Sequence, residues 1–365
     1  MTLPATMAAV LLTGHGGLEK LEYRTDVPVP RPRADEVLIQ VEAAGINNTD
    51  INTRIGWYSK AISGDTNSTA TKGANEPDDD DASWSGVPLT FPRIQGGDVY
   101  GRIVAVGDDV DQRRLGDRVI VRNLMRHYVD RRPYECWTYG SDCDGGFAQF
   151  AVAPSIEAYS IHSDLSSEEL GAISIAYSTA EGMLHRAAVG AEKVVITGAS
   201  GGVGLAAVQL AKLRGAEVTA VCSPSKADVV RAAGADHIVD RGESLTAALG
   251  SRLMDVIVDV VGGEGVSDLL GLLRRGGRYA IAGAIGGPIT EIDLRTIYLN
   301  DLSLLGCTFQ EDAVFENLVR YVNNGQIKPL VSGIYPLAEI HRAQEDFISK
   351  KFPGKLVLVP PPVES

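Results

Sequence analysis

The chain has 365 residues, of which 44% are hydrophobic and 22% are charged, ordinary values for a soluble globular protein with room for two cores. Asp and Glu together number 47 against 34 for Lys and Arg, so the net charge is −13, which repels nucleic-acid phosphates and anionic lipid. The composition therefore argues against a nucleic-acid partner and against a membrane partner.

Neither a membrane segment nor a secretion signal is predicted. No uncharged apolar run reaches the roughly 18 residues that a membrane helix needs, and residues 1–14 lack a basic start and a cleavage-site pattern. The cysteines are too few and too scattered for a disulfide framework: Cys136, Cys143, Cys222 and Cys307. We therefore expect a protein of the reducing cytoplasm.

Residues 1–163 are predicted to be β-rich. Residues 36–42 alternate polar and apolar side chains, the period of a half-buried strand. Residues 101–106 and 117–121 are further short strands, separated by Gly and Asp turns. Residues 63–86 carry almost no apolar side chains, so we expect them to form a flexible surface insertion.

From about residue 165 the pattern changes to strands that alternate with helices. Residues 166–187 are predicted to be helical, with a cap at Ser166. The expected strands are 193–197, 217–221, 237–239, 255–260 and 277–282, and the expected helices are 203–214 and 226–233. This alternation predicts an α/β domain over residues 164–312, with a parallel sheet covered on both faces. Residues 313–365 are expected to return to the first domain.

A glycine-rich turn joins the first of these strands to the helix that follows it. Gly201 would let the backbone approach a pyrophosphate, and Gly204 would let helix and strand pack closely. The N-terminus of the helix would then offer unpaired N–H groups to the phosphates. Any tight strand-to-helix turn can carry glycines, but here strand, helix and the later alternation agree. The expected contacts are Ala199, Ser200, Gly201, Gly202, Val203 and Gly204.

The end of the second strand indicates which nicotinamide nucleotide binds. An NAD site usually carries an acid there, about 20 residues after the glycines, which bonds the ribose hydroxyls. This chain instead has Ser223, Ser225 and Lys226, and Arg241 follows the third strand. These donors suit a 2′-phosphate, which a carboxylate would repel. We therefore expect NADPH, although a capping serine and a solvated lysine at a helix start would give the same pattern.

Several further motifs occur in order along the chain. They are residues 43–50, 96–107, 116–119, 145–150 and 354–358. Together with the glycine turn, they make the chain similar to the medium-chain dehydrogenase/reductase superfamily over nearly its whole length. The resemblance implies a GroES-like β-rich catalytic domain and a Rossmann domain with a doubly wound parallel sheet. It also implies an active site between them, a small-molecule substrate and a homodimer.

Zinc enzymes of this superfamily hold a catalytic metal at three positions, which align here with Asn47, Gly97 and Ile175. None of these is a usual zinc ligand, because zinc requires thiolate, imidazole or carboxylate. Where such enzymes have four cysteines for a structural zinc, this chain has only Cys136 and Cys143. We therefore expect no metal site, and the pattern resembles the zinc-independent quinone oxidoreductase and enoyl reductase branches.

Hydride transfer places negative charge on the acceptor oxygen, so a site without metal needs hydrogen-bond donors and a proton. We expect Asn47 to donate its amide, Thr49 to relay a proton, and Tyr58 to act where related reductases carry an aromatic residue. Structural alternatives stay open for each: a turn, a helix cap and packing, respectively. The remaining expected cofactor contacts are Gly263, Gly283 and Lys355.

Several functions fit these residues. The first is a reductase that passes a hydride from NADPH to a small carbonyl, enone or quinone acceptor. The second is an enoyl-CoA reductase of the crotonyl or acryloyl type, suggested by residues 137–140 ahead of 145–150. An alcohol dehydrogenase-like protein and a non-catalytic NADPH-binding protein remain further alternatives. Turnover of different acceptors distinguishes the enzymes, and tight NADPH binding without turnover would favour the last.

Overall fold

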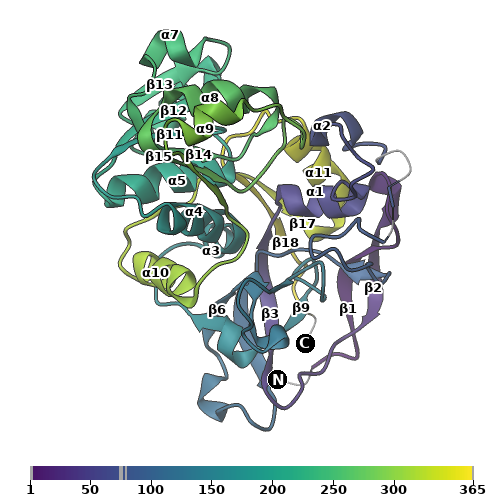
Figure 1. Ribbon diagram of the computed structural model, residues 1–365. Coiled ribbons are helices and arrows are strands. Elements are labelled where there is room, and N and C mark those ends of the chain that lie inside the picture. Colours follow the sequence, from purple (N-terminus) through teal and green to yellow (C-terminus); the bar gives the residue numbers. More distant parts are fainter. Residues whose placement is uncertain (1–2, 74–76, 79, 364–365) are drawn as a thin grey trace. The chain divides into compact units, whose positions relative to one another are not determined.

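The computed structural model describes residues 3–73, 77–78 and 80–363, so the expected insertion at 63–86 lies partly outside the described residues (Figure 1). The chain divides into two compact units. Unit 1 comprises Met1–Ile62, Asn67–Ile175 and Val319–Ser365, and unit 2 comprises Ser63–Thr66 and Ala176–Leu318. Unit 2 thus spans residues 176–318 where the sequence suggested 164–312. The difference arises because residues up to Ile175 bond within unit 1: the Ile175 N–H donates to Asp98 Oδ1 at 2.5 Å.

Unit 1 is built around largely antiparallel sheets. One has the order β2–β1–β4, and a second has the order β10–β6–β5–β3–β18–β17, with β9 also paired to β3. The strands are β1 (Thr6–Leu12), β2 (Leu21–Pro28), β3 (Glu36–Gly45), β4 (Arg93–Ile94), β5 (Tyr100–Val106), β6 (Arg118–Val121), β9 (Phe150–Pro154), β10 (Ala158–Ser160), β17 (Val331–Pro336) and β18 (Lys355–Val359). A short pair, β7 (Leu124–Met125) with β8 (Trp137–Thr138), lies apart from these sheets.

Strand β3 is the centre of unit 1. The alternation of residues 36–42 suggested a half-buried strand, but most of β3 is buried. The strand is central in its sheet, since β5, β9 and β18 all bond to it, and side chains at successive positions, among them Val37, Leu38 and Ile39, belong to the hydrophobic core. The chain end returns to this strand, since Val357 pairs with Gly45 and Leu358 with Ala44. That pairing brings residues from the two ends of the chain together.

Unit 2 contains one six-stranded sheet in which every pairing is parallel, with the order β13–β12–β11–β14–β15–β16. The strands are β11 (Lys193–Ile196), β12 (Glu217–Cys222), β13 (His237–Asp240), β14 (Met254–Asp259), β15 (Leu273–Ile281) and β16 (Ser303–Gly306). This order reverses direction beside the first strand, as in doubly wound sheets that bind ligands at the carboxyl ends of their strands. The expected parallel sheet is confirmed.

The helices agree with the sequence in part. They are α1 (Asn48–Ile55), α2 (Thr66–Thr69), α3 (Ser167–Leu170), α4 (Ser174–Arg186), α5 (Gly202–Leu213), α6 (Ala227–Ala232), α7 (Leu245–Leu249), α8 (Val266–Leu272), α9 (Leu294–Tyr298), α10 (Asp312–Asn323) and α11 (Ile340–Ile348). Residues 166–187 form two helices instead of one, and the first ends at Leu170. Ser166 does cap it, in a reciprocal capping box with Glu169. None of the helices in the described ranges has the length and apolarity needed to span a bilayer.

The insertion is more ordered in its packing than its composition suggested. We expected a surface segment without buried contacts, but Ala70 and Ala82 are fully buried, and Thr66 and Ser83 are nearly so. The Ala70 carbonyl accepts a hydrogen bond from the buried Arg54 guanidinium of α1 at 2.7 Å. The part of the insertion around Ala70 is therefore attached to α1 by a backbone carbonyl, which hydropathy does not reveal.

Candidate active site

The glycine turn of unit 2 has the geometry of an anion cradle. A Cβ at Gly204 would lie 2.2 Å from the Gly198 carbonyl oxygen, so only glycine lets α5 pack this closely on the strand. A Cβ at Gly201 would meet only that same oxygen, at 3.4 Å, and the space beside it is otherwise open. No side chain from the described residues caps α5, which begins after Gly201. The first N–H groups of α5 thus have no capping side chain, the local geometry that the expected pyrophosphate contact requires.

A buried carboxylate that sequence reasoning missed holds the strand ends beside this turn. Asp259, at the end of β14, is fully buried. It accepts short hydrogen bonds from the hydroxyls of Thr197 and Tyr279, and a bond of 2.8 Å from the Val261 N–H. Thr197 follows β11 and Tyr279 lies on β15, so one carboxylate ties three adjacent strands together. It thereby fixes the loops that follow β11 and β14.

The expected 2′-phosphate donors gather at the ends of β12 and β13. The register pairs Cys222 with Asp240, so Ser223 and Arg241 follow on neighbouring strands. The Ser223 and Ser225 hydroxyls lie 3.3 Å apart. The pKa of the Lys226 ammonium is lowered, first by burial and then by the positive charge of Arg241. Lys226 and Arg241 therefore lie close enough for their charges to interact.

Gly263 and Gly283 lie in the loops that follow β14 and β15. A Cβ at Gly263 would come within 2.5 Å of the Gly286 carbonyl oxygen, and one at Gly283 within 2.9 Å of the Val260 carbonyl oxygen. Close packing between the two loops therefore requires glycine at both positions. Their approach to a nicotinamide remains a prediction.

A buried polar cluster in unit 1 joins three residues that are distant in sequence. The Lys355 ammonium, 3% exposed as a residue, donates to Asn47 Oδ1 at 2.6 Å, to Asp98 Oδ2 at 2.8 Å and to the Ile46 carbonyl at 2.9 Å. Asn47 Nδ2 donates to Asp98 Oδ2 at 2.9 Å and to the Gly45 carbonyl at 3.3 Å. All three Lys355 donors are used within the protein, which leaves none for the expected contact with a nucleotide.

This cluster lies where the three aligned zinc-ligand positions meet. A Cβ at Gly97 would be 2.6 Å from Ile175 Cδ1, and the Ile175 N–H and Asn47 amide both bond to Asp98. The side chains present do not fit zinc: an amide whose oxygen is bonded to an ammonium, a glycine and an alkyl group. Across the described residues, no group of three His, Cys, Asp or Glu side chains is placed to hold a metal ion.

Cys136 and Cys143, which stand where zinc enzymes of the superfamily have four cysteines, are both free thiols. Burial is the main reason that the pKa of Cys136 rises to about 11 and that of Cys143 to about 12. Both groups are therefore mainly in the thiol form at neutral pH, which makes them poor nucleophiles.

Asp50 lies beside the cluster, fully enclosed. Its carboxylate accepts hydrogen bonds from the N–H groups of Asn47 at 2.8 Å and Gly96 at 3.3 Å. Burial raises its pKa from 3.8 to about 7, against the opposing effects of those bonds and of the Lys355 charge. The group is thus close to half protonated at neutral pH.

This shift predicts a pH-dependent stability. The native protein holds the Asp50 proton up to a pH of about 7, whereas the unfolded chain releases it near 3.8. Protonation of Asp50 in the native state makes its full contribution to the free energy of unfolding below pH 3.8. This contribution is lost progressively as the pH rises to the native pKa of about 7. Between pH 5.5 and 8, the free energy of unfolding should fall by about 2 kcal/mol relative to that of Asp50→Asn. Urea unfolding of both proteins measures this difference, and parallel pH profiles would contradict it.

The other two expected catalytic residues belong to the same region. Thr49 lies in the first turn of α1 and is half-buried, and its hydroxyl makes no hydrogen bond with any other described residue. Tyr58 follows α1, and burial raises the pKa of its hydroxyl, while a hydrogen bond from Asn52 opposes the rise. The capping box at the start of α1 uses Asn47 and Asp50. The structural alternative for Thr49, a role as the helix cap, is therefore wrong.

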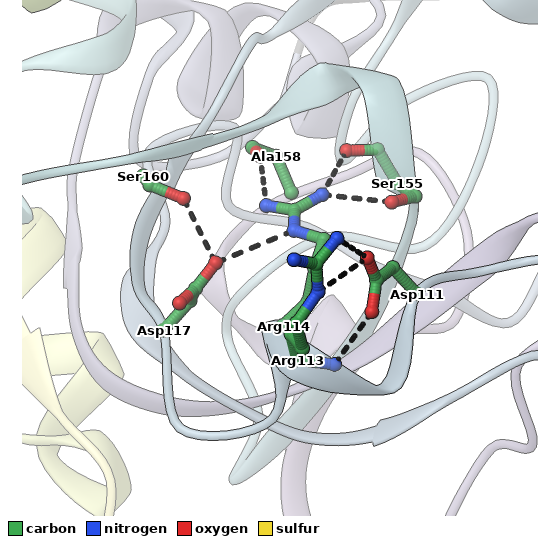
Figure 2. A network of polar contacts seen from close by, with 7 residues as sticks. All are labelled: Asp111, Arg113, Arg114, Asp117, Ser155, Ala158 and Ser160. Atoms are coloured by element: carbon green, nitrogen blue, oxygen red, sulfur yellow. Dashed lines mark hydrogen bonds and ion pairs between the residues drawn. The ribbon is translucent and has the colours of Figure 1, made fainter.

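A surface pocket of unit 1 is a separate feature. Asp35, Asp111, Arg114 and His127 are among the residues that line it. Several of its polar side chains are paired with each other: Asp111 pairs with Arg113, and His127 Nε2 lies 2.6 Å from Asp35 Oδ2. Figure 2 shows that Arg114 turns away from Asp111 and donates to the backbone carbonyls of Ser155 and Ala158, at 2.5 and 2.6 Å. This network joins loops of the fold and brings together no catalytic set.

Known proteins resemble the chain over its full length. Residues 33–163 match the alcohol dehydrogenase GroES-like domain, and residues 202–324 match the zinc-binding dehydrogenase domain. Human quinone oxidoreductase is 30% identical over 97% of this chain and 98% of its own. A candidate alcohol dehydrogenase from Sinorhizobium meliloti 1021 is 46% identical, with a TM-score of 0.89 and 98% of both chains covered. A thermostable alcohol dehydrogenase from Pyrobaculum aerophilum, solved with cobalt and zinc, is 30% identical over 97% of this chain and 99% of that one, with a TM-score of 0.80.

Proposed function

The chain belongs to the medium-chain dehydrogenase/reductase superfamily and is quinone oxidoreductase-like, and on that premise we propose that it passes a hydride from NADPH to a small carbonyl, enone or quinone acceptor without catalytic zinc. Membership also confirms the expected GroES-like domain and Rossmann domain. One observation carries the proposal: Asn47, Gly97 and Ile175 meet around an internal ammonium, and none of them can ligate zinc.

NADPH is the proposed nucleotide because Lys226 and Arg241 concentrate positive charge at the end of the second strand, with the Ser223 and Ser225 hydroxyls beside it. The glycine turn and the first N–H groups of α5 hold the pyrophosphate. The loops around Gly263 and Gly283 border the nicotinamide. When bound, the reduced nicotinamide supplies the hydride, and the protein orients it and excludes water.

Asn47 is proposed to stabilise the charge that develops on the acceptor oxygen. The Lys355 ammonium bonds to its amide oxygen at 2.6 Å and polarises the amide, so that Nδ2 becomes a stronger donor. Of the two Nδ2 bonds, the one to the Gly45 carbonyl is longer, at 3.3 Å, and is the bond that an acceptor oxygen would replace. Lys355 is therefore a positioning residue, and it supplies positive charge close to where a metal would act.

Thr49 is proposed to deliver the proton, because its hydroxyl is half-buried and unengaged among the described residues. Thr49→Val keeps the shape of the side chain and removes the hydroxyl. We expect kcat to fall about 100-fold, the lower range for a lost proton-transfer group, with the KM for NADPH unchanged. Thr49→Ser should retain most of the activity. Steady-state kinetics test this, and an active Thr49→Val enzyme would remove Thr49 from the mechanism.

A second copy of the chain is the proposed partner, on an observation in unit 2. Strand β16 is the edge of the parallel sheet, and apolar side chains at and before it are exposed: Ile289, Leu294, Tyr298, Leu299 and Leu304. An open edge flanked by exposed apolar side chains is suited to pairing with another chain. A homodimer would cover this edge.

Leu304→Asp places a charge on that edge and is expected to convert a dimer into a monomer, because two buried carboxylates would face each other across the pair. Light scattering coupled to size exclusion measures the mass. Leu213→Asp is the matched control, since Leu213 and Leu304 are both 42% exposed in unit 2. A monomeric wild-type protein, or a dimer that persists in Leu304→Asp, would exclude this interface.

An acceptor panel tests the function itself. Absorbance at the NADPH band is followed with quinones, enones, aldehydes and crotonyl-CoA, and we expect the highest kcat/KM for a quinone or enone. Preferred reduction of crotonyl-CoA would indicate the enoyl-CoA reductase instead. Alcohol oxidation is a second candidate, favoured by the 46% identity to the Sinorhizobium meliloti protein, and the same assay run with alcohols and NADP⁺ tests it. NADPH binding without turnover of any of these compounds would refute the proposal.

A further inference from the structure

The carboxylate at the end of β14 is buried without a counter-ion. Asp259 is fully buried, and within the described ranges it forms no ion pair with a Lys, Arg or His side chain. Its donors are instead neutral: the hydroxyls of Thr197 and Tyr279 and the backbone N–H groups of Val261 and Gly262. Burying a charge is costly unless an opposite charge lies near it. The protein therefore keeps an uncompensated negative charge at this end of the sheet.

Hydrogen bonds hold this charge next to the loop that follows β14. The Val261 N–H donates at 2.8 Å, and the Gly262 N–H donates to the two carboxylate oxygens at 3.3 and 3.2 Å. Gly262 and Gly263 have φ of 64° and 72°, a left-handed backbone that other residues rarely adopt. The loop thus turns its first N–H groups back toward Asp259, and the carboxylate lies one hydrogen bond from the backbone just before Gly263.

The proposed nucleotide crosses the sheet edge from one side to the other. Its 2′-phosphate is assigned to the ends of β12 and β13 and its pyrophosphate to the glycine turn after β11. In the strand order β13–β12–β11–β14–β15–β16, the nicotinamide half then continues to the ends of β14 and β15. The loops around Gly263 and Gly283, which are proposed to border the ring, follow these two strands. The ring is therefore assigned to the part of the edge that holds Asp259.

Hydride transfer changes the charge of a nicotinamide ring. The ring gives one hydrogen nucleus with two electrons to the acceptor, which also takes up a proton, and the neutral dihydropyridine becomes a pyridinium cation. A fixed negative charge nearby stabilises the cation and has little effect on the neutral ring, because Coulomb attraction acts on the charged form. The cation that the buried carboxylate lacks is thus one that the reaction itself produces.

We propose that the Asp259 carboxylate shifts the bound nucleotide toward its oxidised form, so that the internal equilibrium of this site favours hydride donation over hydride uptake. This inference rests on the proposed function and gives it a direction, the reduction of an acceptor in preference to the oxidation of an alcohol. Asp259 does not touch the ring: it acts through its charge, which Thr197 and Tyr279 hold in place.

Asp259→Asn tests the proposal, because it removes the charge and keeps the shape of the side chain. The amide oxygen can accept from Thr197 and from the Val261 N–H, and the Tyr279 hydroxyl can rotate to accept from the new amide nitrogen. We expect the Kd for NADP⁺ to rise about tenfold, the effect of unit charges about 10 Å apart at an effective dielectric constant of about 20. The Kd for NADPH should change less than about twofold. Calorimetric titration with each nucleotide gives the two constants.

Two further variants separate the charge from the structure. Tyr279→Phe keeps the carboxylate and loses one hydrogen bond, so the ratio of the two Kd values should stay within about twofold of the wild-type ratio. Asp255→Asn removes a carboxylate from the other end of β14, where Asp255 pairs with Arg274, and should also leave the ratio unchanged. Circular dichroism and thermal unfolding check that each variant is folded. Asp259→Ser, which is also neutral, decides should Asp259→Asn not fold.

Equal weakening of both nucleotides in Asp259→Asn, or an unchanged ratio, overturns the proposal. The same titrations with NAD⁺ and NADH supply the ratio whichever nucleotide binds more tightly. A shifted ratio in a protein that reduces no acceptor would support the role of Asp259 and refute the proposed reductase. An unchanged ratio in an active reductase would do the reverse, and a wild-type protein that binds no nicotinamide nucleotide would refute both.

Discussion

Replacing Lys355 with methionine is expected to lower kcat by up to about 100-fold, the lower end of the range for a lost oxyanion donor, because the Asn47 amide stays in place but is no longer polarised. The free energy of unfolding should also fall, by about 3–5 kcal/mol, because the substitution leaves Asp98 buried without its cation. Both effects follow from one geometry, in which the ammonium bonds to Asn47 and to Asp98 at 2.6 and 2.8 Å. Steady-state kinetics and urea unfolding measure them separately.

The double substitution Lys355→Met with Asp98→Asn separates the two effects. It removes both buried charges, so much of the lost stability should return, whereas activity should not, because the Asn47 amide is no longer polarised. A double variant that regains both stability and activity would mean that Lys355 acts only in folding. A Lys355→Met enzyme with wild-type kcat would show that the Lys355 ammonium does not contribute to the reaction.

Lys226→Ala combined with Arg241→Ala is expected to weaken NADPH binding about 100- to 1,000-fold, because each cation contributes a charge-assisted bond to the 2′-phosphate. The Kd for NADH should change less than about threefold, since NADH carries no phosphate there. Nucleotide fluorescence titration gives both constants. The two cations repel each other in the native protein, so removing both should not destabilise the fold.

Arg231→Ala serves as the control for this pair, because Arg231 is a cation of the neighbouring α6 that already pairs with Asp228 at 2.8 Å. It should leave the affinity for both nucleotides unchanged. Equal losses of NADPH and NADH affinity in the double variant would indicate damage to the sheet end. Unchanged NADPH affinity would refute the 2′-phosphate site.

The parallel sheet was predictable from sequence because its inner strands are short apolar runs between helices, and burial on both faces requires that composition. Strand β16 was missed because it is an edge strand whose residues are mostly exposed, so it carries no hydrophobic signal. Helices α7 and α9 were missed for a related reason: each has five residues and no buried side chain. Local patterns report burial, and β16, α7 and α9 have little of it, whereas α8 was missed although four of its side chains are buried.

The site was predictable only where its residues are close in sequence. The glycine turn and the pair Asn47 and Thr49 stand in local motifs. The contact between Asn47 and Asp98 joins residues 51 positions apart, and that between Asn47 and Lys355 joins residues 308 positions apart. Lys355 was instead assigned to the cofactor, because the sequence shows that a lysine is charged but does not show which residue it bonds. Asp259 was missed for the same reason, since its hydroxyl partners lie on other strands.

The central claim is that hydride moves from NADPH to an organic acceptor with no metal acting on the acceptor oxygen. The most direct measurement uses protein stripped with a strong chelator and assayed for metal content, together with NADPH deuterated at the transferable position. One deuterium is expected to appear in the reduced product, and the stripped protein should transfer it at the same rate as the untreated protein. Loss of this transfer on stripping, with recovery on addition of Zn²⁺, would contradict it.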